Sequence, residues 1–333
     1  MTAYQLLPSD EYPHAPTGER HFNESVYMNA FDHARGMGGW MRLGNRVNEG
    51  YAELSVCLYL PDGRIACQFQ RPAIERNDRF DAGGLSVEVL APLQRLRMRY
   101  AGEVMLVRDP NLLRSPRRLF AEAERAPAEV VWEHEGTSPT HGGIPTDDHS
   151  PTLYGRDFSL GHFNQHTRVR GFIRIGDEHW PVDGYGWRDH SWGPRYWQNI
   201  LFDRLFMANF GADRGLMLLK IANNDGQVRR GGVLQFDGDY EEIVDLDLFN
   251  DWNPERDPVG FLLTVRTSRR VAVIRGEILR CAPLRNRREE NGVTLESRIA
   301  ECFTRLDWDG RTGYGMTEYV ERLIDGVPAG FPL

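Results

Sequence analysis

The chain has 333 residues, of which 41% are hydrophobic and 26% are charged, and its formal net charge is -8. This composition is typical of a globular protein, and the negative charge excludes the broad basic surface of most nucleic-acid-binding proteins. No apolar run approaches the ~20 residues that span a bilayer, and residues 1–16 lack the pattern of a signal peptide. We therefore expect a cytoplasmic protein without an integral membrane segment.

Most of the chain has the pattern of antiparallel strands. The apolar residues Leu96, Met98 and Tyr100 alternate with arginines, which predicts a strand with one buried face and one wet face. Further strands are expected, in chain order, at residues 51–60, 84–92, 169–176, 215–223, 231–238, 261–267, 270–279 and 294–308. Asp-Gly turns close several of these segments, which favours hairpins over the strand–helix alternation of a parallel sheet.

One short helix and one long loop interrupt the strands. Ser115 is a suitable N-cap, Pro116 suits the first helical position, and residues 117–126 continue the helical pattern. Residues 134–155 are rich in Gly, Pro, Ser, Thr and Asp, which predicts a long loop that links two units or covers a site. Because strand patterns lie on both sides of this loop, we expect two β-barrels or sandwiches.

Motifs for metals and nucleotide cofactors are absent from the sequence. The four cysteines have no C-x-x-C spacing, and we expect them to be reduced and buried. His162 and His166 have the spacing of a helical zinc site, but in the predicted strand they would stand ~13 Å apart. No G-x-G-x-x-G, P-loop or G-x-S-x-G motif is present. We therefore expect no metal and no cofactor.

Residues 184–195, GYGWRDHSWGPR, are the densest group of chemically capable side chains. In an extended backbone one face carries Tyr185, Trp187, Asp189 and Ser191, and the other carries Arg188, His190 and Trp192. A carboxyl group among large rings loses hydration and suits proton donation, and the rings can stabilise a developing carbocation. The structural alternative is that Asp189 pairs with Arg188 or Arg195 and clasps two units together.

The block that contains this motif, residues 165–197, resembles the superfamily of tandem lipocalin-like proteins, which includes carotenoid hydratases, AttH-like proteins and two-barrel Diels-Alderases. Those families carry an Asp-His pair followed by Trp-Gly at the junction of two barrels, which matches Asp189, His190, Trp192 and Gly193. Residues 82–102 and 313–331 are similar to bacterial relatives. The resemblance implies two barrels, no metal or organic cofactor, and acid-assisted chemistry or cyclisation of hydrophobic substrates.

We therefore predict an all-β protein of two lipocalin-like antiparallel β-barrels in tandem, with one or two short helices. The first barrel is assigned to residues 1–184. The second is assigned to residues 185–333, and it begins with the RDHSWG motif. The cavity is expected at or near the junction.

The predicted function is cofactor-independent acid–base catalysis in which Asp189, aided by His190, transfers a proton to or from a hydrophobic isoprenoid, steroid-like or aromatic molecule. Hydration, dehydration, isomerisation and cyclisation share that step. The predicted substrate-binding residues are Tyr185, Trp187, Trp192, Gln165, His166 and Glu318, with electrostatic support from Arg188 and Arg195. The alternative is a non-catalytic carrier of hydrophobic ligands in which the motif only joins the barrels.

Overall fold

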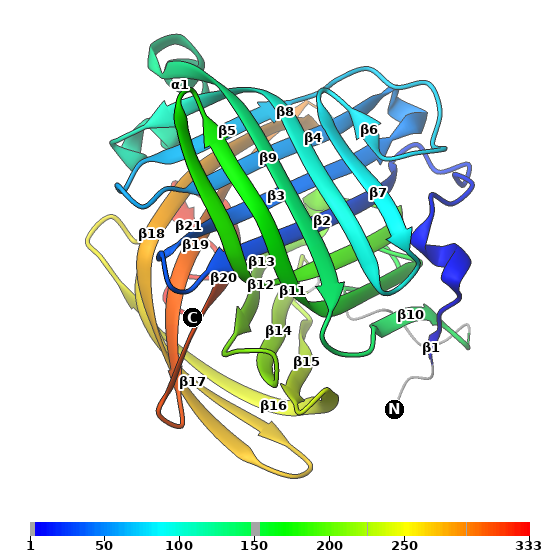
Figure 1. Cartoon of the computed structure of the whole chain (residues 1–333), viewed down its shortest axis with the longest axis vertical. Coiled ribbons are helices and arrows are strands. Elements are labelled where there is room, and N and C mark those ends of the chain that lie inside the picture. Colours follow the sequence, from blue (N-terminus) through cyan, green and yellow to red (C-terminus); the bar gives the residue numbers. More distant parts are fainter. Residues whose placement is uncertain (1–3, 148–153, 225, 291) are drawn as a thin grey trace. The chain divides into compact units, whose positions relative to one another are not determined.

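Antiparallel strands make up most of the protein in the computed structural model, which describes residues 4–147, 154–224, 226–290 and 292–333 (Figure 1). The chain divides into two compact units. The first comprises Met1–Asp62, Ala66–Leu106 and Glu124–Tyr196, and the second comprises Gly63–Ile65, Val107–Ala123 and Trp197–Leu333. The predicted boundary between residues 184 and 185 lies inside a strand of the first unit.

The first unit contains a closed ring of eight strands. The ring runs through β2 (Phe22–Asp32), β3 (Met37–Arg46), β4 (Tyr51–Tyr59), β5 (Ile65–Gln70), β8 (Arg95–Val107), β9 (Glu124–Gly136), β11 (Gly161–Ile175) and β12 (Glu178–Pro194). The last strand of the ring, β12, pairs with the first, β2, which closes the barrel. The flanking elements are β1 (Tyr4–Gln5), β6 (Asp81–Ala82), β7 (Leu85–Ala91), β10 (His141–Pro145), and the 3-10 helices η1 (Pro8–Glu11) and η2 (Val47–Glu49).

The second unit contains a sheet whose strands pair in sequence order. They are β13 (Ile200–Asn209), β14 (Arg214–Asn223), β15 (Val228–Phe236), β16 (Asp239–Trp252), β17 (Pro258–Thr267), β18 (Val271–Glu290), β19 (Val293–Trp308), β20 (Arg311–Ile324) and β21 (Val327–Pro328). Strand β20 also pairs with β13, so the hydrogen-bonding ring returns to its start. The remaining elements are η3 (Pro110–Arg114), α1 (Pro116–Glu122) and η4 (Trp197–Asn199). The predicted all-β fold of two tandem barrels is confirmed.

Asp-Gly dipeptides form the tight turns that the sequence predicts. Asp237 and Gly238 join β15 to β16 with φ values of 49° and 86°, and Asp309 and Gly310 join β19 to β20 with 49° and 73°. Positive φ at both central residues is the type I′ geometry, whose twist matches that of the flanking strands. These turns set the register of both hairpins.

Side chains that alternate along the strands fill both interiors. In the first unit the inward positions of β2 include Val26 and Met28, which pack with Met98 and Trp132 in one buried cluster. In the second unit a separate buried cluster includes Phe206, Leu218, Trp308 and Tyr319. None of the helices among the described residues has the length and apolarity needed to cross a bilayer.

Two local predictions have mixed outcomes. The helix forms where expected, but it ends at Glu122, because β9 begins at Glu124 and takes the residues that were predicted to continue it. The stretch predicted as one long loop, residues 134–155, contains the end of β9 and the strand β10, which pairs with β11. That prediction was therefore wrong for these strands, and residues 148–153 lie outside the described residues.

Candidate functional site

Strand β12 places the residues of the central motif alternately on the two faces of the first barrel. His190 lies opposite Val26, a core residue, and therefore points inward, because opposed residues of paired strands share a face. Asp189 lies opposite Tyr27 and Asn164 and points outward. The two residues predicted to act together in catalysis are thus on opposite faces of the barrel wall.

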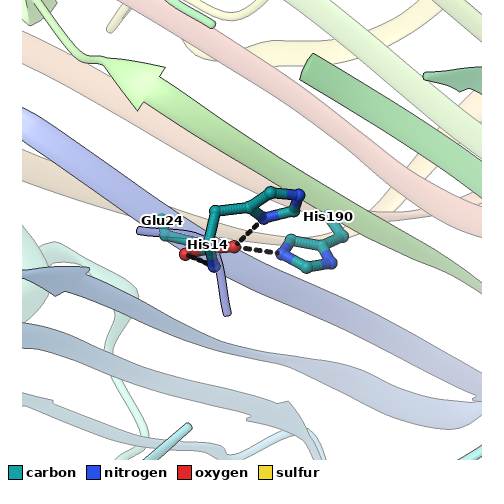
Figure 2. Close-up of side chains that lie close together, drawn as sticks. All are labelled: His14, Glu24 and His190. Atoms are coloured by element: carbon teal, nitrogen blue, oxygen red, sulfur yellow. Dashed lines mark hydrogen bonds and ion pairs between the residues drawn. The ribbon is translucent and has the colours of Figure 1, made fainter. Parts of the chain in front are cut away.

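On the inner face, His190 belongs to a cluster with Glu24 and His14 (Figure 2). His14 Nδ1 donates to Glu24 Oε1 at 2.7 Å, and His190 Nε2 donates to the same oxygen at 3.0 Å. Glu24 comes from β2 and His190 from β12, whereas His14 follows η1 in the N-terminal segment. The cluster therefore joins three separate parts of the chain.

Glu24 is fully buried, and its second carboxylate oxygen is also satisfied. Glu24 Oε2 accepts hydrogen bonds from the backbone nitrogen of His14 at 2.8 Å and from Asn77 Nδ2 at 2.6 Å. Burial alone would raise the pKa of Glu24, but hydrogen bonds and charge interactions with the two histidines outweigh it and hold this pKa below its usual value. Glu24 is therefore an ionised carboxylate inside the barrel.

Aromatic rings enclose the two histidines. The ring of His14 stacks on Trp192, with ring centroids 3.8 Å apart and planes 12° apart. His190 makes edge contacts with Trp192 at 5.3 Å and with Phe80 at 5.4 Å, and a tilted contact with Phe163 at 5.3 Å. Trp192, a predicted pocket residue, thus packs against both histidines.

Arg188 lies on the inner face and has its own buried carboxylate partner. Its Nη1 donates to Glu11 Oε1 at 2.5 Å, and its Nε donates to Gln165 Oε1 at 2.7 Å. Glu11 Oε2 in turn accepts from the backbone nitrogen of Leu93 at 2.6 Å. The proposed pairing of Arg188 with Asp189 is therefore wrong, because adjacent residues of a strand face opposite ways.

Gln165 lines a pocket of about 380 Å³ in the first unit. Its Nε2 donates to the backbone oxygens of Leu93 and Ser138 at 3.1 and 2.8 Å, while its Oε1 binds Arg188. Glu135 and Thr140 also line this pocket. Gln165 therefore forms part of the pocket wall, but its amide group already makes three hydrogen bonds within the protein.

On the outer face, Asp189 forms a hydrogen bond with His162 of β11. His162 Nε2 donates to Asp189 Oδ2, and the two side chains are 7% and 15% exposed. The Tyr154 ring contacts His162 edge to face at 5.1 Å and stacks on Phe158 at 4.8 Å. Asp189 therefore has a histidine partner, but that histidine is His162 rather than the predicted His190.

Arg195 lies on the same side of the barrel wall but donates elsewhere. Its Nη2 binds Ser191 Oγ at 2.8 Å, its Nε binds the backbone oxygen of Phe158 at 3.1 Å, and its guanidinium lies 3.9 Å from the centroid of the Phe158 ring. Burial, reinforced by the positive charge of Arg42, lowers the pKa of Arg195 to about 9. The hydrogen bonds of Arg195 thus anchor the segment that carries Phe158.

The other predicted residues have contacts of their own. Tyr185 lies below the Arg168 guanidinium at 4.7 Å, and Trp187 packs on His166 with centroids 4.7 Å apart. Burial lowers the pKa of His166 to about 3, so this ring is neutral. Glu318 belongs to β20 of the second unit, whereas the motif belongs to the first unit.

Three residues of these clusters escaped the sequence interpretation. Glu24 had a visible signal, because it stands between the inward apolar residues Phe22 and Val26 in the alternation of β2. His162 was considered only as a metal ligand. His14 lies outside any strand, so no periodicity marked it.

Solved structures share the fold at low sequence identity. The crystal structure of CghA aligns with a TM-score of 0.58 and 11% identity over 92% of this chain and 90% of that chain. A putative AttH protein from Nitrosomonas europaea gives 0.55 and 13% over 95% and 97%, and kievitone hydratase from Nectria haematococca gives 0.56 and 9% over 96% and 93%. The resemblance to tandem lipocalin-like proteins is thus confirmed as a shared fold.

Comparison at the level of sequence gives the family. No curated protein matches the sequence. The family described as Domain of unknown function (DUF7064) matches residues 7–322, a range that covers the strands of both rings except the last two residues of β20. The chain therefore belongs to this family of unknown function.

Proposed function

We propose that the protein is an acid–base enzyme for a hydrophobic small molecule, working without an organic cofactor, and that the His162 and Asp189 pair transfers the proton. The observation that carries the proposal is the hydrogen bond from His162 Nε2 to Asp189 Oδ2. A carboxylate that accepts from one ring nitrogen fixes the tautomer and leaves the other nitrogen free to accept or give a proton. His162 Nδ1 is then the reacting atom, and Asp189 orients the ring.

The surroundings of His162 support an apolar ligand. The ring of Tyr154 lies next to it and stacks on the ring of Phe158, and the His162 side chain remains 7% exposed. Aromatic rings bind hydrocarbon surfaces well and stabilise a developing positive charge through their faces. Isoprenoid, steroid-like and polycyclic aromatic compounds fit this environment better than sugars or nucleotides do.

Hydration of a carbon–carbon double bond, or its reverse, is the reaction that we propose to test first. The imidazolium of His162 would donate its Nδ1 proton to one alkene carbon, and water would add to the other carbon and return a proton to His162. The support is that kievitone hydratase shares this fold. Isomerisation and cyclisation begin with the same proton transfer and would appear in the same assay.

The test compares His162→Gln and Asp189→Asn with the wild type on a panel of terpenoid, steroid and aromatic alkenes and alcohols. Mass spectrometry detects the gain or loss of water, and chromatography detects isomers. Loss of the proton-transfer group should lower turnover about 100-fold or more. The matched control is Asp183→Asn, which removes an exposed carboxylate of the same strand that pairs with Arg168.

Two results would contradict the enzyme proposal. One is turnover that survives in both variants after correction for the folded fraction. The other is a wild-type protein that binds a ligand but does not convert it. Tryptophan fluorescence and thermal shift would detect that binding. That second result would favour the carrier of hydrophobic ligands.

A further inference from the structure

The cluster of His14, Glu24 and His190 brings three groups that can bind a metal close together inside the first barrel. Its three ligand-type atoms, two imidazole nitrogens and one carboxylate oxygen, all lie within 4.8 Å of one another. Two histidines and one carboxylate are a donor set that binds zinc and other divalent first-row metals. The cluster is separate from the His162 and Asp189 pair on the other face of the barrel wall.

The spacing of the donor atoms suits a metal ion. Two ligand atoms that are each about 2.1 Å from a metal stand about 3.0 Å apart at a right angle and about 3.4 Å apart in a tetrahedron. Glu24 Oε1 lies 2.7 Å from His14 Nδ1 and 3.0 Å from His190 Nε2. Shifts of a few tenths of an ångström would therefore bring each histidine nitrogen to coordination spacing from Glu24 Oε1. The two histidine nitrogens would close on the same ion from a separation of at most 4.8 Å.

The charge balance also favours a cation. Glu24 is fully buried and ionised, and the groups that stabilise its charge are two histidines and an amide rather than an arginine or a lysine. A second carboxylate, Asp10, has its Oδ1 3.6 Å from His14 Nε2. An ionised carboxylate inside a protein is costly unless it is paired or coordinates a metal, and a divalent cation would supply the opposite charge here.

The atoms around the ligands are arranged as metal sites require. Asn77 and the backbone of His14 hold Glu24 Oε2, which leaves Oε1 directed at both histidines. Asp10 Oδ1 lies 3.6 Å from the far nitrogen of His14, beyond hydrogen-bond distance but on the side from which a carboxylate commonly orients a metal-bound histidine. Asn77 is itself fixed, because its Oδ1 accepts from Asn45 at 2.9 Å. The hydrogen bonds that hold Glu24 Oε2 are therefore in place.

We propose that His14 Nδ1, Glu24 Oε1 and His190 Nε2 bind one divalent transition-metal ion, with Zn²⁺ as the ion to be tested. The ion would crosslink the N-terminal segment to β2 and β12 and so fasten that segment to the first barrel. This site departs from the expectation of no metal, which rested on the absence of metal-binding motifs from the sequence and on the resemblance to tandem lipocalin-like proteins. It does not depend on the proposed function.

The first experiment uses the purified full-length protein after treatment with a chelator. Zn²⁺ is titrated by calorimetry and by thermal shift, and Co²⁺ is titrated by visible absorption, which reports directly on its ligands. We expect one equivalent of Zn²⁺ to bind and to raise the melting temperature, and one equivalent of Co²⁺ to give bands that Zn²⁺ displaces. Absence of saturable binding of both metals would overturn the proposal, leaving a hydrogen-bonded cluster only.

Variants then locate the site. His14→Ala removes a ligand from a segment outside the strands, so the barrel should still fold, and it should abolish the stoichiometric binding. Asn77→Ala removes a supporting hydrogen bond and should weaken Zn²⁺ binding by roughly tenfold. The matched control is His21→Ala, because His21 also contacts a carboxylate, Glu49, at 3.3 Å in the same segment. Equal binding by wild type and His14→Ala, or equal loss in His21→Ala, would refute the assignment.

Discussion

Acidification should destabilise the first barrel through His134. This side chain lies on β9 inside the barrel wall, is 1% exposed, and shares a hydrogen bond of 2.9 Å with Thr167 Oγ1 through its Nδ1. Burial, reinforced by the positive charge of Arg188, lowers the pKa of His134 from 6.5 to about 3. Below the unfolded pKa, the unfolded chain takes up a proton that the folded protein does not take up until about pH 3. Stability therefore falls as the pH drops through this window.

The magnitude follows from the two pKa values. One such histidine lowers the free energy of unfolding by about 1.4 kcal/mol between about pH 7.5 and about pH 5.5. We would measure urea unfolding of the wild type and His134→Gln across this range by tryptophan fluorescence. The stability difference between these two proteins should change by that amount across the range. The control is His179→Gln, which replaces an exposed histidine, and its stability difference from the wild type should not change with pH. A difference that stays constant with pH would refute the reasoning.

Three further predictions concern stability and thiol reactivity. Arg188→Met leaves the buried carboxylate of Glu11 without its partner and should cost about 3–5 kcal/mol, measured by urea unfolding. A stability within error of the wild type would contradict the assignment of Glu11 and Arg188 as a stabilising buried pair. Gly161→Ala places a methyl group 2.1 Å from the Trp192 ring and should cost about 1–3 kcal/mol, with a changed tryptophan spectrum. Burial raises the pKa of Cys67 to about 12, so this thiol should react with Ellman's reagent only after unfolding.

The fold could be predicted from short-range patterns because those patterns decide it locally. Alternation around Leu96 and Met98 indicates which face of a strand is buried, and an Asp-Gly pair such as Asp237 and Gly238 fixes a hairpin by its own backbone preference. The helix was placed by its capping residue and by Pro116. Its end was missed because the strand pairing of β9 overrode helix propensity.

The candidate site could be predicted only in part, because its partners meet through barrel closure. Glu24 and His190 are 166 residues apart, and their contact depends on the register between β2 and β12. The alternation within the motif correctly placed Asp189 on the opposite face of the strand from Arg188 and His190. No local pattern could show which residues of other strands each face would contact. A carboxylate among apolar inward positions was the one signal available for Glu24.

The segment from Val107 to Ala123 has a consequence for how the protein is made. It leaves the ribosome between strands of the first barrel, yet it belongs to the second unit, where Arg114 forms an ion pair with Asp257. Its partner strands are synthesised more than a hundred residues later. The first barrel can therefore form during synthesis before this segment has its partner strands. A cut between residues 196 and 197 would separate the segment from the rest of the second unit.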